Sequence, residues 1–166
     1  MDTLKELEAL RGRHPQPPAA GSAEEKRALA TFGQFFSSFA PDRVSSLLPQ
    51  TYAEDVYFND TLKVVRGREA LAHYLKDSAE AVESCRVEIQ EVTRTAHDEH
   101  LVRWTMMIRF KRFKRGVDTW TVGMSHLRFD ADGRVVYHQD YWNAADGLFQ
   151  HIPLLGTAIS AIKRRL

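Results

Sequence analysis

The sequence predicts one α+β domain, in which a cone-shaped, curved antiparallel sheet wraps around about three N-terminal helices. Helical periodicity is confined to the first half of the 166-residue chain, where apolar residues recur three and four positions apart. The second half alternates apolar and polar residues over long stretches joined by short turns, which is typical of consecutive antiparallel strands. Helices that precede the strands, rather than alternating with them, indicate the α+β class.

Three parts of the chain are expected from its composition. Residues 1–21 are predicted to be a flexible N-terminal arm, because a short helical stretch is followed by a proline-rich linker at 14–21. Residues 22–150 form the cone-shaped domain. Residues 151–166 are expected to be a C-terminal helical tail that packs on this domain.

The helices of the domain are predicted from capping signals and apolar stripes. The first begins at a capping box formed by Ser22 and Glu25. Its inward face is an apolar stripe at helical spacing, made by Leu29, Phe32, Phe36 and Phe39. A short second helix is expected over 44–48, and a third from 69 to about 81.

The strands are predicted from alternation and turn signals. An extended run covers 52–60, and later strands are expected over 86–95, 100–114, 117–129 and 134–142.

The last of these strands carries the main functional signal. Alternation places Val136, His138, Asp140 and Trp142 on one face and Val135, Tyr137, Gln139 and Tyr141 on the other. A carboxylate is rarely buried unless it is paired or used chemically. We therefore expect the first face to line a ligand pocket, with Asp140 as a reactive group. His138, about 7 Å away along the strand, is either an assisting donor or a satisfied core histidine.

Composition narrows the possible partners. The 23 basic and 22 acidic residues nearly cancel, so neither nucleic acid nor a membrane is expected as a partner. The N-terminus is too charged for a signal peptide, and a cytoplasmic protein is expected. One cysteine, no glycine-rich phosphate loop and no metal-ligand spacing predict a protein without metal or cofactor.

Four segments resemble the nuclear transport factor 2-like superfamily: 52–60, 66–71, 126–136 and 140–142. Its members include ketosteroid isomerases, polyketide cyclases, scytalone dehydratase and limonene epoxide hydrolase. The resemblance extends over about residues 24–150 and implies the cone-shaped fold. It also implies a homodimer formed through the outer face of the sheet, and a hydrophobic small molecule as the ligand.

The resemblance also implies individual site residues. The position of the ketosteroid isomerases' proton-shuttling aspartate falls on Asp60, and the position of their second aspartate falls on Ser125. The last-strand aspartate of the epoxide hydrolases matches Asp140. Their water-positioning Asn and Tyr fall on Asp60 and Phe58 or, with a shift of one residue, on Asn59 and Tyr57. The middle carboxylate of the hydrolase set has no counterpart in this sequence.

The candidate catalytic residues are therefore Asp60, Asp140 and His138. The candidate substrate-binding residues are Phe58, Trp104, Ser125, Trp142, Tyr57 and Asn59. Two carboxyls in one apolar cone would couple, and burial would raise at least one pKa towards neutrality. This predicts a pocket protein of the ketosteroid isomerase or polyketide cyclase type, acting as a cofactor-free acid/base isomerase, cyclase or dehydratase on a hydrophobic substrate.

Three alternatives remain open at this stage. Asp60 could simply cap a turn, and the aromatic residues could be ordinary core. The protein could be a non-catalytic module of the same fold that binds ligands or other proteins. It could also be an epoxide hydrolase-like enzyme with an incomplete triad.

Overall fold

The computed structural model describes residues 2–112, 115–144, 148–149, 161–162 and 164 of the chain. The helices within these residues are α1 (Asp2–Arg13), α2 (Ala23–Ser37), α3 (Pro41–Thr51) and α4 (Arg68–Ala81). The strands are β1 (Tyr52–Asn59), β2 (Val64–Arg66), β3 (Val82–Arg94), β4 (His100–Phe110), β5 (Asp118–Phe129) and β6 (Val135–Trp142). The predicted α+β class is confirmed.

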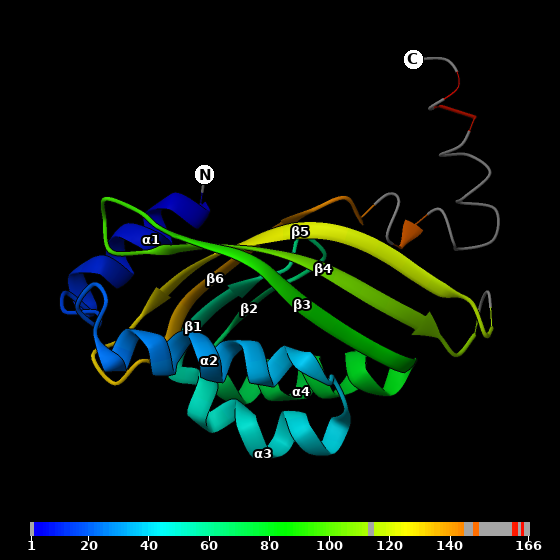
Figure 1. Cartoon of the computed structure of the whole chain (residues 1–166), viewed down its shortest axis with the longest axis horizontal. Coiled ribbons are helices and arrows are strands. Elements are labelled where there is room, and N and C mark those ends of the chain that lie inside the picture. Colours follow the sequence, from blue (N-terminus) through cyan, green and yellow to red (C-terminus); the bar gives the residue numbers. More distant parts are fainter. Residues whose placement is uncertain (1, 113–114, 145–147, 150–160, 163, 165–166) are drawn as a thin grey trace.

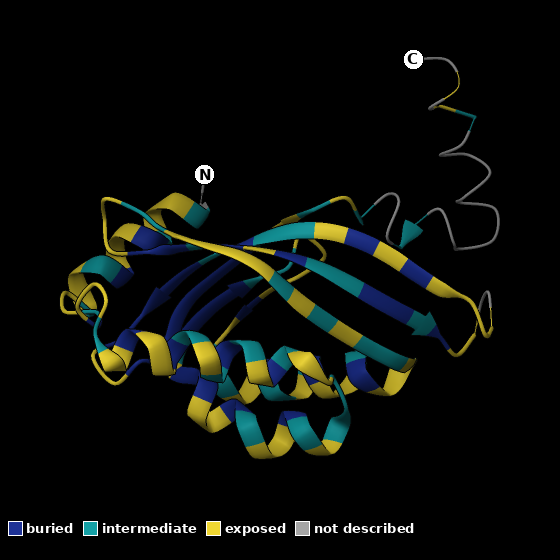
Figure 2. Ribbon diagram, viewed as in Figure 1, coloured by how far each residue is buried: buried dark blue, intermediate teal, exposed yellow. Residues whose placement is uncertain are grey.

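A curved, open sheet arches over three of the helices. Its strand order is β2-β1-β6-β5-β4-β3. Figure 1 shows α2, α3 and α4 on one side of the sheet and α1 on the other. The main core lies between the sheet and α2, α3 and α4, with Phe32, Leu71 and Phe129 among its buried members. In Figure 2 much of β3 alternates between intermediate and exposed positions, and the first residues of β5 alternate between exposed and buried ones, as a sheet with one covered face should.

Helix α2 begins where its capping signal predicted. The Ser22 hydroxyl accepts a hydrogen bond from the Glu25 backbone N–H at 3.1 Å, which caps α2. Helix α3 is longer than expected because Pro41 occupies its first turn, where a missing N–H costs nothing. Gly67 precedes α4 with a φ of 83°, a conformation that glycine adopts without strain.

The pairing of β1 was not foreseen. Strands β3, β4, β5 and β6 pair antiparallel in sequence order, as predicted. Strand β1 instead lies parallel to β6, with Phe58 opposite His138 and Asn59 opposite Gln139. The short β2, which was also missed, extends the sheet beyond β1. As a consequence, Asp60, which directly follows β1, lies beside β6, the strand that carries Asp140.

One register shift changes the faces of β6. The pairing slips opposite Arg128 and Phe129, so that Val135 faces the main core while Val136 and Tyr137 both join the cluster beneath α1. A bulge of this kind reverses the alternation locally. The expectation that Val136 shares a face with His138 was therefore wrong.

Helix α1 is packed on the outer face of the sheet. Leu7 and Leu10 are buried in the cluster with Val136 and Tyr137. Arg11 donates two hydrogen bonds, of 2.6 and 2.9 Å, to the carboxylate of buried Glu99. These contacts differ from the flexible arm expected for residues 1–21.

The predicted C-terminal tail, 151–166, lies largely outside the described residues, and the structure does not test it. Among the helices that the structure describes, none has the length and apolar character needed to cross a membrane.

Candidate functional site

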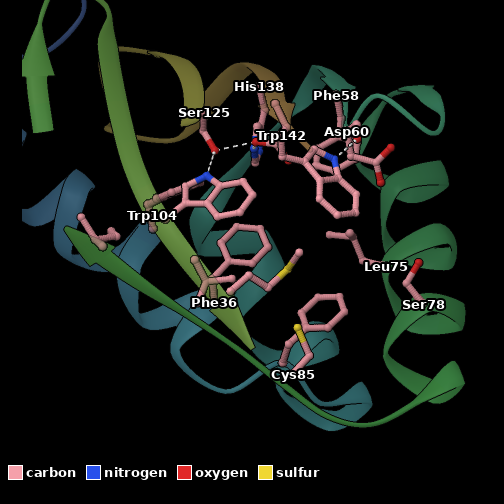
Figure 3. A pocket seen from close by; sticks show the side chains of 16 residues that line it. Phe36, Phe58, Asp60, Leu75, Ser78, Cys85, Trp104, Ser125, His138 and Trp142 are labelled. Atoms are coloured by element: carbon pink, nitrogen blue, oxygen red, sulfur yellow. Dashed lines mark hydrogen bonds and ion pairs between the residues drawn. The ribbon is translucent and has the colours of Figure 1, made fainter. Parts of the chain in front are cut away.

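A cavity of about 120 Å³ lies between the sheet and the helices. Figure 3 shows the side chains around it. The apolar part of its wall comes from Phe32, Phe36, Phe39, Phe58, Leu75, Val87, Ile89, Trp104, Met106 and Trp142. The polar part comes from Asp60, Ser78, Cys85, Ser125, His138 and Asp140. A cavity of about 150 Å³ accepts benzene, so this one is somewhat smaller than a cavity known to hold a single aromatic ring.

Asp140 is held by two neighbours through a single oxygen. Its Oδ1 accepts a hydrogen bond from the Ser125 hydroxyl at 2.5 Å and one from His138 Nε2 at 2.8 Å. The Ser125 hydroxyl in turn accepts from the Trp104 indole N–H at 2.9 Å. Within the described part of the chain, the second oxygen, Oδ2, has no hydrogen-bond partner. Asp140 therefore has one carboxylate oxygen held by two protein donors and one without a protein donor among the described residues.

His138 connects Asp140 to a buried tyrosine. Its Nδ1 lies 2.8 Å from the hydroxyl of Tyr52. Burial, together with the charge of Asp140, raises the pKa of Tyr52 well above its usual range, so this phenol keeps its proton. We assign the tautomer in which Tyr52 donates to Nδ1 and Nε2–H donates to Asp140. His138 is thus both a satisfied buried histidine and the group that orients Asp140.

Asp60 lines the cavity and also caps a turn. Its Oδ1 accepts the backbone N–H groups of Leu62 and Lys63 at 3.0 and 2.9 Å. Its Oδ2 accepts the hydroxyl of Tyr74, on α4, at 2.5 Å. Burial and this hydrogen bond both raise the pKa of Tyr74, which therefore remains a donor. The two interpretations of Asp60 considered from the sequence hold together, but three donors already occupy its carboxylate.

Two tryptophans form opposite parts of the wall. The Trp142 indole N–H donates to the Asp60 backbone carbonyl at 2.8 Å, which ties β6 to the end of β1. Trp104 lies against Gly123 on β5, and a Cβ at that glycine would overlap the indole ring. The glycine thus permits the close approach that lets Trp104 reach Ser125.

The structure gathers seven of the nine predicted site residues around the cavity: Asp60, Asp140, His138, Phe58, Trp104, Ser125 and Trp142. It places the other two elsewhere. Tyr57 points to the outer face, where it stacks on Tyr137 and its hydroxyl lies 3.1 Å from that of Thr3. The Asn59 side chain accepts the Thr61 backbone N–H and is not part of the cavity wall. The unshifted alignment, with Phe58 and Asp60 inward, is the one that fits the cavity.

Sequence reasoning missed two tyrosines that complete the site. Tyr52 supports His138, and Tyr74 supports Asp60. The spacing of apolar residues along α4 contains no signal that pairs Tyr74 with Asp60. Throughout the ranges that the structure describes, no three His, Cys, Asp or Glu side chains are arranged to hold a metal ion.

Comparison with known families agrees with this architecture. The model of the SnoaL-like domain matches residues 32–138, which is more than half of the chain. The chain belongs to the SnoaL-like domain family. The matched region of this SnoaL-like protein runs from α2 to His138 and includes most of the cavity wall. A search of curated protein sequences found no match.

Solved structures show the same fold at low sequence identity. A LEH-like epoxide hydrolase from M. tuberculosis is 16% identical with a TM-score of 0.61, and the match covers 87% of this chain and 98% of that one. A protein from Jannaschia sp. CCS1, provisionally named a SnoaL-like polyketide cyclase, is 15% identical with a TM-score of 0.58, covering 76% and 92% of the two chains.

A third structure holds a small ligand. A protein with a ketosteroid isomerase-like fold from Catenulispora acidiphila, in complex with trimethylamine, is 17% identical with a TM-score of 0.62, covering 75% of this chain and 91% of its own. At these identities, the three likenesses establish the fold of this SnoaL-like protein and leave its reaction open.

Proposed function

We propose that this SnoaL-like protein is a cofactor-free acid/base enzyme that acts on a hydrophobic small molecule, with Asp140 as the proton-transferring group. The observation that carries the proposal is the state of the Asp140 carboxylate. Ser125 and His138 fix one of its oxygens, while the other has no protein partner among the described residues, and Asp140 belongs to the wall of a largely apolar cavity. A positioned base of this kind typically contributes about 10²- to 10⁴-fold to a rate.

The proposed roles differ among the site residues. Asp140 Oδ2 takes a proton from a carbon of the bound substrate and returns it to another atom, as an isomerase, cyclase or dehydratase requires. His138 and Ser125 keep the carboxylate in place and stabilise its charge, and Tyr52 holds His138 in one tautomer. Asp60 is a poorer candidate for the second acid/base group, because Tyr74 and two backbone N–H groups already occupy it. The aromatic wall supplies binding energy through apolar contact.

The experiment measures proton exchange, which does not require the natural reaction to be known. Single-ring ketones and enones are incubated with the protein in D₂O, and loss of the C–H signal next to the carbonyl is followed by NMR. We expect the wild type to exceed Asp140→Asn by about 10²- to 10⁴-fold for any compound that binds. The matched control is Asp132→Asn, which changes a carboxylate whose side chain is 73% exposed and lies outside the cavity. Equal exchange rates in wild type and Asp140→Asn would contradict the proposal.

A second candidate function is a non-catalytic binding module of the same fold. The full occupation of the Asp60 carboxylate by protein donors favours it, because only one carboxylate is then left for chemistry. In the same assay, compounds that bind without any exchange would support this function in place of catalysis. An epoxide hydrolase-like reaction rests on the likeness to the M. tuberculosis fold relative, and styrene oxide added to the compound panel would detect it as diol.

A further inference from the structure

The polar side chains of the cavity can accept a hydrogen bond from a ligand but have almost no donor left to offer it. Its side-chain N–H and O–H donors, apart from the weakly donating Cys85 thiol, are already used within the protein. Trp104 donates to Ser125, Ser125 and His138 donate to Asp140, and Trp142 donates to the Asp60 carbonyl. The remaining hydroxyl, Ser78, donates to the backbone carbonyl of Tyr74 at 2.8 Å. What the cavity offers a ligand is therefore an acceptor, Asp140 Oδ2.

The charge of the cavity wall favours a cationic ligand over an anionic one. Two carboxylates, Asp60 and Asp140, belong to its wall, and no lysine or arginine of the described residues does. Lys63 is exposed and lies over the Tyr74 ring with its Nζ 5.1 Å from the ring centroid. An anionic ligand would meet like charge, with only the weakly donating Cys85 thiol to receive it.

The aromatic wall adds to this preference. Six of the lining residues present aromatic rings: Phe32, Phe36, Phe39, Phe58, Trp104 and Trp142. Phe32, Phe36 and Phe58 surround the His138 ring with centroid distances of 5.5, 6.0 and 4.8 Å, so they lie close to the group that orients Asp140. The faces of aromatic rings attract cations, by about 0.5–2 kcal/mol at each favourable contact.

From these three features we infer that the ligand of this cavity is a hydrophobic amine, bound as its ammonium ion with its carbon skeleton against the aromatic wall. One N–H is donated to one lone pair of Asp140 Oδ2, and the second lone pair of this oxygen is left for the proton that the proposed reaction removes from carbon. The inference rests on the proposed function, since it names the substrate class of the same site. An alcohol, which can donate but has no charge, binds more weakly, and a carboxylate of the same size is rejected.

The test compares three probes that differ only in their polar group: benzylammonium, benzyl alcohol and benzoate. Binding is followed through the NMR signals of the Trp104 and Trp142 indole N–H groups, which lie in the cavity wall. We expect benzylammonium to bind at least about tenfold more tightly than benzoate, with benzyl alcohol between them. Benzoate or benzyl alcohol binding as tightly as benzylammonium, or no binding by any probe, would overturn the inference.

Two variants locate the cause of the preference. Asp140→Asn removes the charge and should reduce benzylammonium binding by about tenfold while leaving benzyl alcohol within about twofold. Phe36→Leu keeps an apolar wall without the ring and should weaken benzylammonium about two- to fivefold more than benzyl alcohol. Asp132→Asn should leave all three probes unchanged. A preference for benzylammonium that survives Asp140→Asn intact would refute the assigned contact.

The outcome is separable from that of the proposed function. Selective binding of benzylammonium together with unchanged proton exchange in Asp140→Asn would leave the ligand class standing and remove the catalytic role. Loss of exchange in Asp140→Asn, together with no preference for benzylammonium, would support the catalytic role and remove the inferred ligand class.

Discussion

Replacing Glu99 by Gln should release helix α1 from the sheet and destabilise the whole domain. The Glu99 side chain is 2% exposed, although it is charged. It accepts both hydrogen bonds from Arg11 of α1 and another, of 2.8 Å, from His126 on β5. Arg128 lies 3.7 Å from the same carboxylate. Glutamine retains the shape of the side chain but removes the negative charge that faces Arg11 and Arg128.

The magnitude follows from the pKa of Glu99. Burial alone would raise this pKa, but the hydrogen bonds from His126 and Arg11 outweigh burial and lower it from 4.5 to about 2. This difference in pKa between the unfolded and the folded protein corresponds to about 3 kcal/mol of stability near neutral pH, because a tenfold change in an equilibrium constant is worth about 1.4 kcal/mol. Removing one partner of a buried ion pair typically costs about 3–5 kcal/mol, which agrees with this value.

The assay is urea denaturation of wild type and Glu99→Gln between pH 7 and pH 2. Because the folded-state pKa lies below the unfolded one, the stabilisation is complete above pH 4.5 and is lost as the pH falls towards 2. The difference in unfolding free energy between the two proteins should thus be constant near neutral pH and shrink in acid.

A matched control separates this effect from a general loss of charge. Glu91 pairs with Arg103 at 3.4 Å, and both side chains are more than half exposed. Glu91→Gln should therefore cost less than about 1 kcal/mol. The reasoning is refuted if Glu99→Gln costs no more than this control, or if its cost does not change with pH.

Three further predictions concern the cavity and the outer face. Gly123→Ala should push the Trp104 ring away from β5, lowering stability by about 1–3 kcal/mol in urea and shifting the Trp104 indole N–H signal in NMR; an unchanged signal would contradict it. Burial raises the pKa of Cys85 to about 12, so its thiol should react with Ellman's reagent at pH 8 far more slowly in the folded protein than in urea, and equal rates would show that it is accessible. We also propose a homodimer through the outer face of β5, where Trp120 is 53% and Val122 is 63% exposed; Trp120→Glu should then give a monomer in light scattering, and a monomeric wild type at micromolar concentration would rule the dimer out.

The sequence by itself determined the local features of the site. Alternation along a strand is a property of the backbone, so the common face of His138, Asp140 and Trp142 could be predicted from spacing alone. The cap of α2 and the inward stripe with Phe32 and Phe36 follow from equally local rules. The likeness to the superfamily then supplied what spacing could not, namely that Asp60 belongs to the same pocket.

The tertiary structure decided everything that depends on which segments meet. The parallel pairing of β1 with β6 brings Asp60 beside Asp140, and no local period encodes a contact across some eighty residues. The same pairing carries Tyr52 to His138, and the packing of α4 carries Tyr74 to Asp60. The bulge that turns Val136 outward arises from the register with β5, which a single strand does not contain. Local spacing thus determined which side chains of one strand share a face, whereas the long-range pairing of strands determined their partners and hence which carboxylate oxygen remains available to a ligand.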